Sequence, residues 1–81
     1  MSGHETFTSQ VPEGDFIVLQ QRNRWVVKRA VDRGHSQTTW VVRGGEEPAV
    51  AQALVFARHD GTSVWLRVDD RQFRLVQSFR P

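Results

Sequence analysis

Alternating apolar and polar positions near the end of the chain predict a β-hairpin. Residues 64–79 read V-W-L-R-V-D-D-R-Q-F-R-L-V-Q-S-F, in which two alternating runs flank an acidic turn. A period of two residues is typical of a strand with one face in the core and one face outside it. We expect the aliphatic side to face the core. It consists of Val64, Leu66, Val68, Phe73 and Leu75. The opposite side, which carries Trp and Arg, then faces outward.

Three further strands are expected earlier in the chain. Residues 16–20 and 25–30 are apolar runs separated by a short polar turn, which suits an antiparallel hairpin. Residues 38–43 are rich in β-branched and aromatic side chains, so a third strand is expected there. We expect residues 32–37, which contain a glycine, to form the loop before it.

One amphipathic helix is expected after the third strand. Glu46 and Glu47 suit the positive end of a helix dipole, and Pro48 suits the first helical position. Gly61 fits the position just past the helix. The apolar stripe has a period of 3.6 and comprises Ala49, Val50, Ala53, Leu54, Phe56 and Ala57. The order β-β-β-α-β-β predicts a small two-layer α+β domain, with an antiparallel or mixed sheet and one helix on one face.

The length of 81 residues suits one domain. Residues 1–14 are rich in Ser, Thr, Gly and Glu and predict a flexible leader, from which Phe7 is able to dock onto the body. Residues 15–81 then form the α+β domain. The absence of cysteine excludes a disulfide framework and a thiolate nucleophile. No run approaches the roughly 20 apolar residues of a membrane span, and no secretory signal is recognisable. We expect a cytoplasmic protein that does not contact a membrane.

The net charge is small but unevenly distributed. The chain carries 11 basic and 9 acidic residues, a net charge of +2. Residues 1–15 hold three of the acids and no base, so residues 16–81 carry +5. All the basic residues except Lys28 are arginine. Arginine suits planar contacts with phosphate or carboxylate, although a GC-rich genome gives the same bias.

The order of elements resembles a bacterial family of uncharacterised proteins. The matching segments are Phe16-Ile-Val-Leu, Trp25-Val-Val-Lys28, the Ala-rich run from Ala49 to Arg58, and Gly61-Thr-Ser-Val-Trp-Leu-Arg-Val-Asp-Asp. They span most of residues 16–79 and are similar to the motifs of domain-of-unknown-function family twenty-one eighty-eight. The resemblance implies the same fold and a bacterial source. It implies no activity, because the family is itself uncharacterised.

No constellation of residues indicates catalysis. His4, His35 and His59 lie in three different segments, and none has a partner at metal-ligand spacing. Ser36 follows His35, but adjacency along the chain does not create a nucleophile–base pair. We therefore predict no catalytic residue, no metal site and no cofactor, and we expect that the protein is not an enzyme.

The outward side of the last hairpin is the predicted contact face. It comprises Trp65, Arg67, Arg74 and Val76, with Arg80 beyond the strand end. Three interpretations remain open: a solvated surface, a homodimer or protein-binding surface, and a surface for single-stranded nucleic acid or RNA. We predict a non-enzymatic interaction module that self-associates or binds another protein through this face. Nucleic-acid binding by its Trp and Arg side chains is the alternative.

Overall fold

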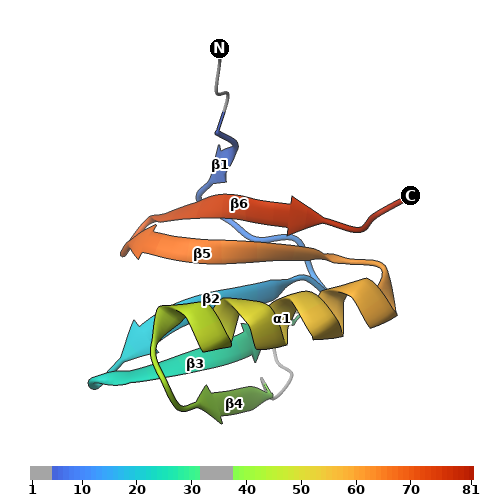
Figure 1. The fold of residues 1–81 in the computed structure, drawn as a ribbon. Coiled ribbons are helices and arrows are strands. Elements are labelled where there is room, and N and C mark those ends of the chain that lie inside the picture. The colour runs from blue at the N-terminus through green and yellow to red at the C-terminus, as the bar shows by residue number, and fades with distance from the viewer. Residues whose placement is uncertain (1–4, 32–37) are drawn as a thin grey trace.

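One helix lies across one face of a six-stranded sheet (Figure 1). The structure is a computed structural model and describes residues 5–31 and 38–81. The elements are β1 (Phe7–Thr8), β2 (Phe16–Gln21), β3 (Arg24–Arg29), β4 (Thr39–Val42), α1 (Glu46–Asp60), β5 (Ser63–Asp69) and β6 (Gln72–Ser78). The strand order is β1-β6-β5-β2-β3-β4, and β2 pairs with β5 in parallel while all other neighbours are antiparallel. The predicted α+β class, with one helix on one face of a mixed sheet, is confirmed.

The β2–β3 hairpin closes through a two-residue turn. Gln21 is opposite Arg24, and the residues between them, Arg22 and Asn23, have φ angles of 52° and 64°. Positive φ at both central positions matches the right-handed twist of the flanking strands. The predicted hairpin is therefore confirmed, and its turn requires a backbone conformation that few residues adopt readily.

The helix packs closely on the sheet because its central stripe is alanine. Ala49, Ala53 and Ala57 are fully buried, and a methyl side chain lets the helix backbone come near the strands. The helix begins at Glu46, two residues earlier than the position of Pro48 predicts. It ends at Asp60, and Gly61 caps it in the left-handed conformation, with the Thr62 N–H donating to the Ala57 carbonyl.

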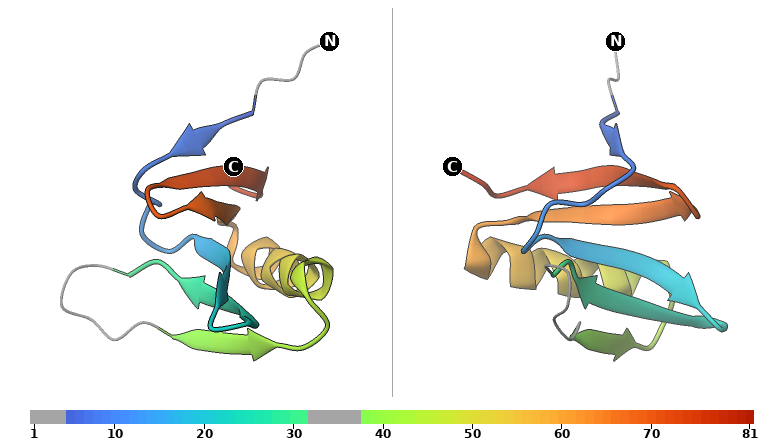
Figure 2. Two further views of the ribbon diagram at one scale, coloured as in Figure 1. Left: turned by 90° about the vertical axis from the view of Figure 1, so that its left-hand side faces the viewer. Right: turned by 180° about the vertical axis from the view of Figure 1, so that it is seen from behind.

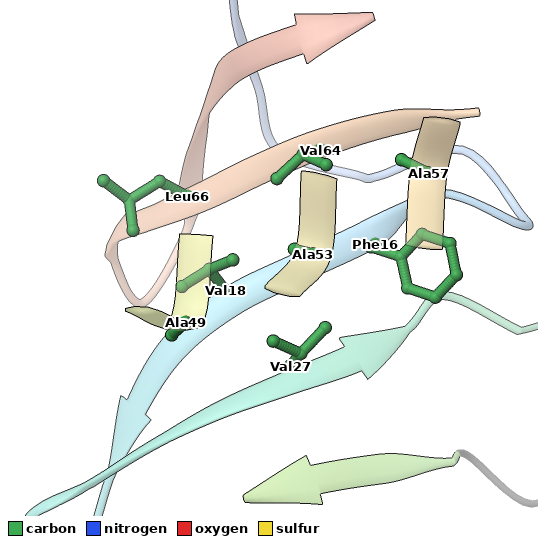
Figure 3. Close-up of a cluster of buried hydrophobic side chains, with 8 residues drawn as sticks. All are labelled: Phe16, Val18, Val27, Ala49, Ala53, Ala57, Val64 and Leu66. Carbon is green, nitrogen blue, oxygen red and sulfur yellow. The ribbon is translucent and has the colours of Figure 1, made fainter. Parts of the chain in front are cut away.

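The core lies between α1 and the strands β2, β3 and β5, as Figure 3 shows. Its sheet side is formed by Phe16, Val18, Val27, Val64 and Leu66, and its helix side by the three alanines. Full burial of one such aliphatic or aromatic side chain contributes about 1.5–3 kcal/mol. At one end of this core, the Phe16, Trp40 and Phe56 rings pack together with centroids 4.6 to 6.0 Å apart. This cluster joins α1 to β4.

Two of the residues expected in a flexible leader, Phe7 and Thr8, form a short strand at the edge of the sheet. Phe7 and Thr8 form β1 opposite Arg74 and Phe73 of β6, and the Leu75 N–H donates to the Thr6 carbonyl at 2.8 Å. Between β1 and β2 the chain crosses the sheet face opposite α1, which we call the back face (Figure 2). The Phe7 side chain is still 42% exposed. The segment is thus held by backbone pairing, which requires no apolar pattern and leaves little trace in the sequence.

Candidate functional site

The five predicted contact residues do not share one face of the sheet. Trp65 and Arg67 lie on the back face, opposite Leu75 and Phe73 of β6. Arg74 is opposite Leu66, a residue of the helix-side core, and Val76 packs against the same core. Arg80 lies beyond the end of β6. The prediction that Arg74 and Val76 face outward together with Trp65 is therefore wrong.

Two register shifts in the β5–β6 hairpin account for this difference. Asp69 is opposite Gln72, and a regular ladder from that pair would place Trp65 opposite Val76. One shift leaves Val68 without an opposite residue, and a second leaves Val76 without one. Such bulges insert one extra residue into one strand, and a shift by one position exchanges the two faces.

Between the two bulges the faces of β6 are thus reversed relative to the regular ladder. Phe73 and Leu75, expected in the helix-side core, lie on the back face beside Trp65 instead. Val68, expected in the same core, is 46% exposed. Beyond the second bulge the original register returns, with Val64 opposite Gln77.

Trp65 faces away from α1, as predicted, but it is buried there. Only 7% of the residue is exposed. Its indole Nε1–H donates to Asp15 Oδ2 at 2.9 Å. A buried Trp normally has such a partner, and the hydrogen bond makes burial of the polar edge tolerable. An indole held in this way does not offer its face to a partner or to a nucleobase.

Asp15 is the centre of a polar junction on the back face. The residue is 1% exposed, and its carboxylate accepts from the Ser63 N–H at 3.1 Å as well as from Trp65. The Arg80 guanidinium also donates to it as an ion pair. The backbone is held too, because the Asp15 carbonyl accepts from the Ala30 N–H at 2.8 Å. A buried carboxylate is stable only when its oxygens are satisfied, and here they join the N-terminal segment, β5 and the C-terminal residues.

Sequence reasoning missed this junction. Asp15 directly precedes the apolar strand β2. Trp65, in the apolar strand β5, has an indole N–H that needs a hydrogen-bond acceptor when it is buried. These two signals lie 50 positions apart, so the sequence gives no reason to pair them. Arg80, predicted to bind a partner, has the role of a counter-ion to Asp15 in the described structure.

Arg67 is engaged within the β5–β6 turn. Its Nε–H donates to the Asp69 carbonyl at 3.2 Å, and its guanidinium pairs with the exposed Asp70 carboxylate. The Asp69 side chain accepts from the Arg71 N–H at 2.8 Å, as Asp commonly does in turns. The acidic turn is thus organised by its own contacts.

The titratable groups within the described ranges form no metal-binding cluster. No three His, Asp, Glu or Cys side chains converge in residues 5–31 and 38–81. The His59 ring lies 3.0 Å from the neighbouring Asp60 carboxylate, which also pairs with Arg29 at 3.2 Å. His4, His35 and Ser36, considered above, lie outside the described residues. No helix in the described part of the chain is both long enough and apolar enough to span a bilayer.

The strand β4 is an open edge of the sheet. It is last in the strand order, and Val41 is 55% exposed. The Arg29 N–H donates to the Thr38 carbonyl at 3.3 Å, and hydrogen-bonded pairs alternate along an antiparallel ladder. By this alternation the backbone groups of Thr39 and Val41 point away from β3, and no described residue pairs with them.

This edge lacks the features that usually prevent strands from associating. Proteins protect exposed edges with Pro, Lys, inward charges or bulges. The sequence of β4, T-W-V-V, contains no Pro or charged residue, and its pairing with β3 is regular. Sequence analysis predicted the strand but not its place at the edge, because strand order is a property of the folded sheet.

Comparisons with known proteins do not assign this site. No protein-family model matches the chain, and neither curated proteins nor solved structures give a match. The resemblance to domain-of-unknown-function family twenty-one eighty-eight therefore stays a prediction. The candidate site is therefore defined by geometry alone. The edge strand β4 is open, whereas on the predicted contact face Trp65 is buried and bonded to Asp15.

Proposed function

We propose that the protein is a non-catalytic interaction module that self-associates through β4. A second copy would add its own β4 antiparallel to the first and continue the sheet across the edge. The observation that carries this proposal is the outward direction of the backbone groups of Thr39 and Val41, beside an exposed Val41 side chain. Strand addition to an open edge is a common mode of protein recognition.

The edge is self-complementary in one register. If Val41 lies opposite Val41 of the second copy, Thr39 lies opposite Arg43 and Trp40 opposite Val42. This register brings together the positions whose backbone groups point outward, and it keeps both helices on the same side of the joined sheet. No like charges meet, and a twofold axis relates the two copies, as in most homodimers.

The proposal keeps the predicted self-association but moves it from the face of the sheet to its edge. The face containing Trp65 offers less for a partner, because the indole is buried and bonded to Asp15. Val41, in contrast, is an apolar residue that is 55% exposed at the edge of the sheet. A partner strand would bury part of this side chain and would form hydrogen bonds with the outward backbone groups of Thr39 and Val41.

The solution mass tests this proposal. Sedimentation or light scattering over a range of concentrations should show a species of twice the 9.3 kDa chain mass. Val41→Lys should shift the equilibrium to monomer, since it places charges opposite each other at the twofold axis. Val55→Lys is the matched control: Val55 is 63% exposed on the helix, and the same substitution there should leave the mass unchanged.

A second variant separates backbone pairing from side-chain contact. Proline is tolerated on edge strands when its nitrogen faces outward, so Val41→Pro removes a donor to the second copy and leaves the β3 ladder intact. It should also give monomers that keep the native circular dichroism spectrum. A wild-type chain that stays monomeric at high concentration, or a dimer unaffected by both Val41 variants, would end the proposal.

A further inference from the structure

Three arginines gather at one corner of the sheet. Arg22 lies in the β2–β3 turn, Arg24 is the first residue of β3, and Arg43 follows the last residue of β4. Trp25 is opposite Val42, which brings Arg24 and Arg43 to the same end of adjacent strands. The described ion pairs with Asp residues use other arginines, namely Arg29, Arg67 and Arg80. The three corner arginines have no carboxylate partner among the described residues.

Two surface grooves meet at this corner. One has a volume of about 300 Å³, with Arg22, Arg24, Gln21 and Thr39 around the apolar Val26 and Val41. The other has a volume of about 400 Å³, and its lining includes Arg24, Arg43, Asn23 and the half-buried Trp25. Arg24 lines both grooves, so they adjoin. Every charged residue in either lining is an arginine.

The turn backbone gives an independent reason to regard Arg22 as selected for its side chain. Arg22 has a φ of 52°, a region that disfavours most residues. Two-residue turns of this kind strongly prefer Asn or Gly at that position. An arginine there raises the cost of the turn, and residues in such conformations cluster at binding sites. The turn therefore carries the Arg22 guanidinium at its tip, although this residue lowers the stability of the turn.

We propose that this corner binds the phosphodiester backbone of single-stranded nucleic acid. Guanidinium groups contact phosphate oxygens in a planar, bidentate manner. Two adjoining open grooves suit a chain of phosphates better than one isolated phosphate. Trp25 packs partly against the core, and its accessible part lines the second groove with Arg24 and Arg43. An aromatic side chain beside basic residues is the combination that single-strand binding sites use.

This site differs from the predicted nucleic-acid surface, which relied on Trp65. It also does not rest on self-association, because a single chain forms both grooves. Glu46 and Glu47 follow the corner at the start of α1, and both are exposed. Neither carboxylate lines a groove.

Fluorescence anisotropy with a labelled single-stranded oligonucleotide of about 12 nucleotides tests the proposal. The test variant is Arg22→Gln/Arg24→Gln/Arg43→Gln. The control, Arg58→Gln/Arg71→Gln/Arg74→Gln, removes the same charge from positions outside both grooves. We expect binding at low salt, a loss of about tenfold or more in the test variant, and a loss below about threefold in the control.

The salt dependence gives a second readout. Each phosphate contact contributes about 0.7 to the slope of log affinity against log salt for single strands. The corner variant should therefore lose about 2 from this slope, while the control keeps it. Three outcomes overturn the proposal: no binding at low salt, equal losses in the two variants, or equally tight binding of a polyglutamate peptide. Circular dichroism of both variants shows whether the fold is retained.

Discussion

The indole N–H of Trp65 donates to the Asp15 carboxylate at 2.9 Å and joins two residues that lie 50 positions apart. The contact is buried on both sides, since Asp15 is 1% and Trp65 is 7% exposed. It explains why a tryptophan on the sheet face without a helix is nevertheless inaccessible. It also fixes the N-terminal segment against β5. The helix therefore packs on one face of the sheet, and the N-terminal segment is attached to the other.

Asp15→Ala should destabilise the fold by about 2–4 kcal/mol, because it leaves the buried N–H groups of Trp65 and Ser63 without an acceptor. Arg80 adds less to the loss, since its half-exposed side chain can be hydrated. Urea denaturation measures the change. Asp70→Ala is the control: its side chain is 92% exposed and pairs with Arg67, so its removal should cost less than about 1 kcal/mol. Similar losses in the two variants would contradict a structural role for Asp15.

Trp65→Phe tests whether the two residues act as a pair. The single variant removes the N–H donor and part of the ring. In combination with Asp15→Ala, the loss should be smaller than the sum of the single losses by about 1 kcal/mol or more, because the same hydrogen bond cannot be lost twice. Additive losses in urea denaturation would show that the contact contributes nothing specific.

Removal of residues 1–8 should release the outer edge of β6. The Leu75 N–H, which donates to the Thr6 carbonyl at 2.8 Å, would lose its acceptor. We expect faster hydrogen exchange at this amide and a loss of about 1 kcal/mol in stability. NMR hydrogen exchange on the full and shortened chains makes the comparison. If the Leu75 amide exchanges equally fast in both, residues 1–8 behave as the leader that the sequence suggested.

The close approach of α1 to the sheet leaves no room for a larger side chain at Ala53, which is fully buried. Ala53→Leu should therefore lower the melting temperature and cost about 1–3 kcal/mol through overpacking. Ala51→Leu places the same side chain on the exposed side of the helix and should change stability by less than about 0.5 kcal/mol. A neutral Ala53→Leu variant would show that the helix moves away at little cost.

Periodicity was sufficient to predict α1, five of the strands and the two hairpins, but not the register of the second hairpin or the order of the strands. The alanine stripe of α1, the strands β2 to β6 and the exposed Val55 follow from local pattern. The face assignment of β6 failed because the bulges at Val68 and Val76 each shift the ladder by one residue. Nothing in V-W-L-R-V or in F-R-L-V-Q marks a bulge. The strand β1 was not predicted because a run of two residues shows no periodicity. The hydrogen bonds of Asp15 were not predicted because its partners are distant in the chain.

The parallel pairing of β2 with β5 has a consequence for the rate of folding. Three of the four antiparallel pairs among the described strands, β2–β3, β3–β4 and β5–β6, join consecutive strands, whereas the short β1–β6 pair joins the first strand to the last. The β2–β5 seam closes only when a long intervening stretch, including α1, has been looped out. The entropy of closing such a loop must be overcome before the contacts across it contribute. We therefore expect the ladders between consecutive strands to form early. Pairing of β2 with β5 should then limit the rate of folding.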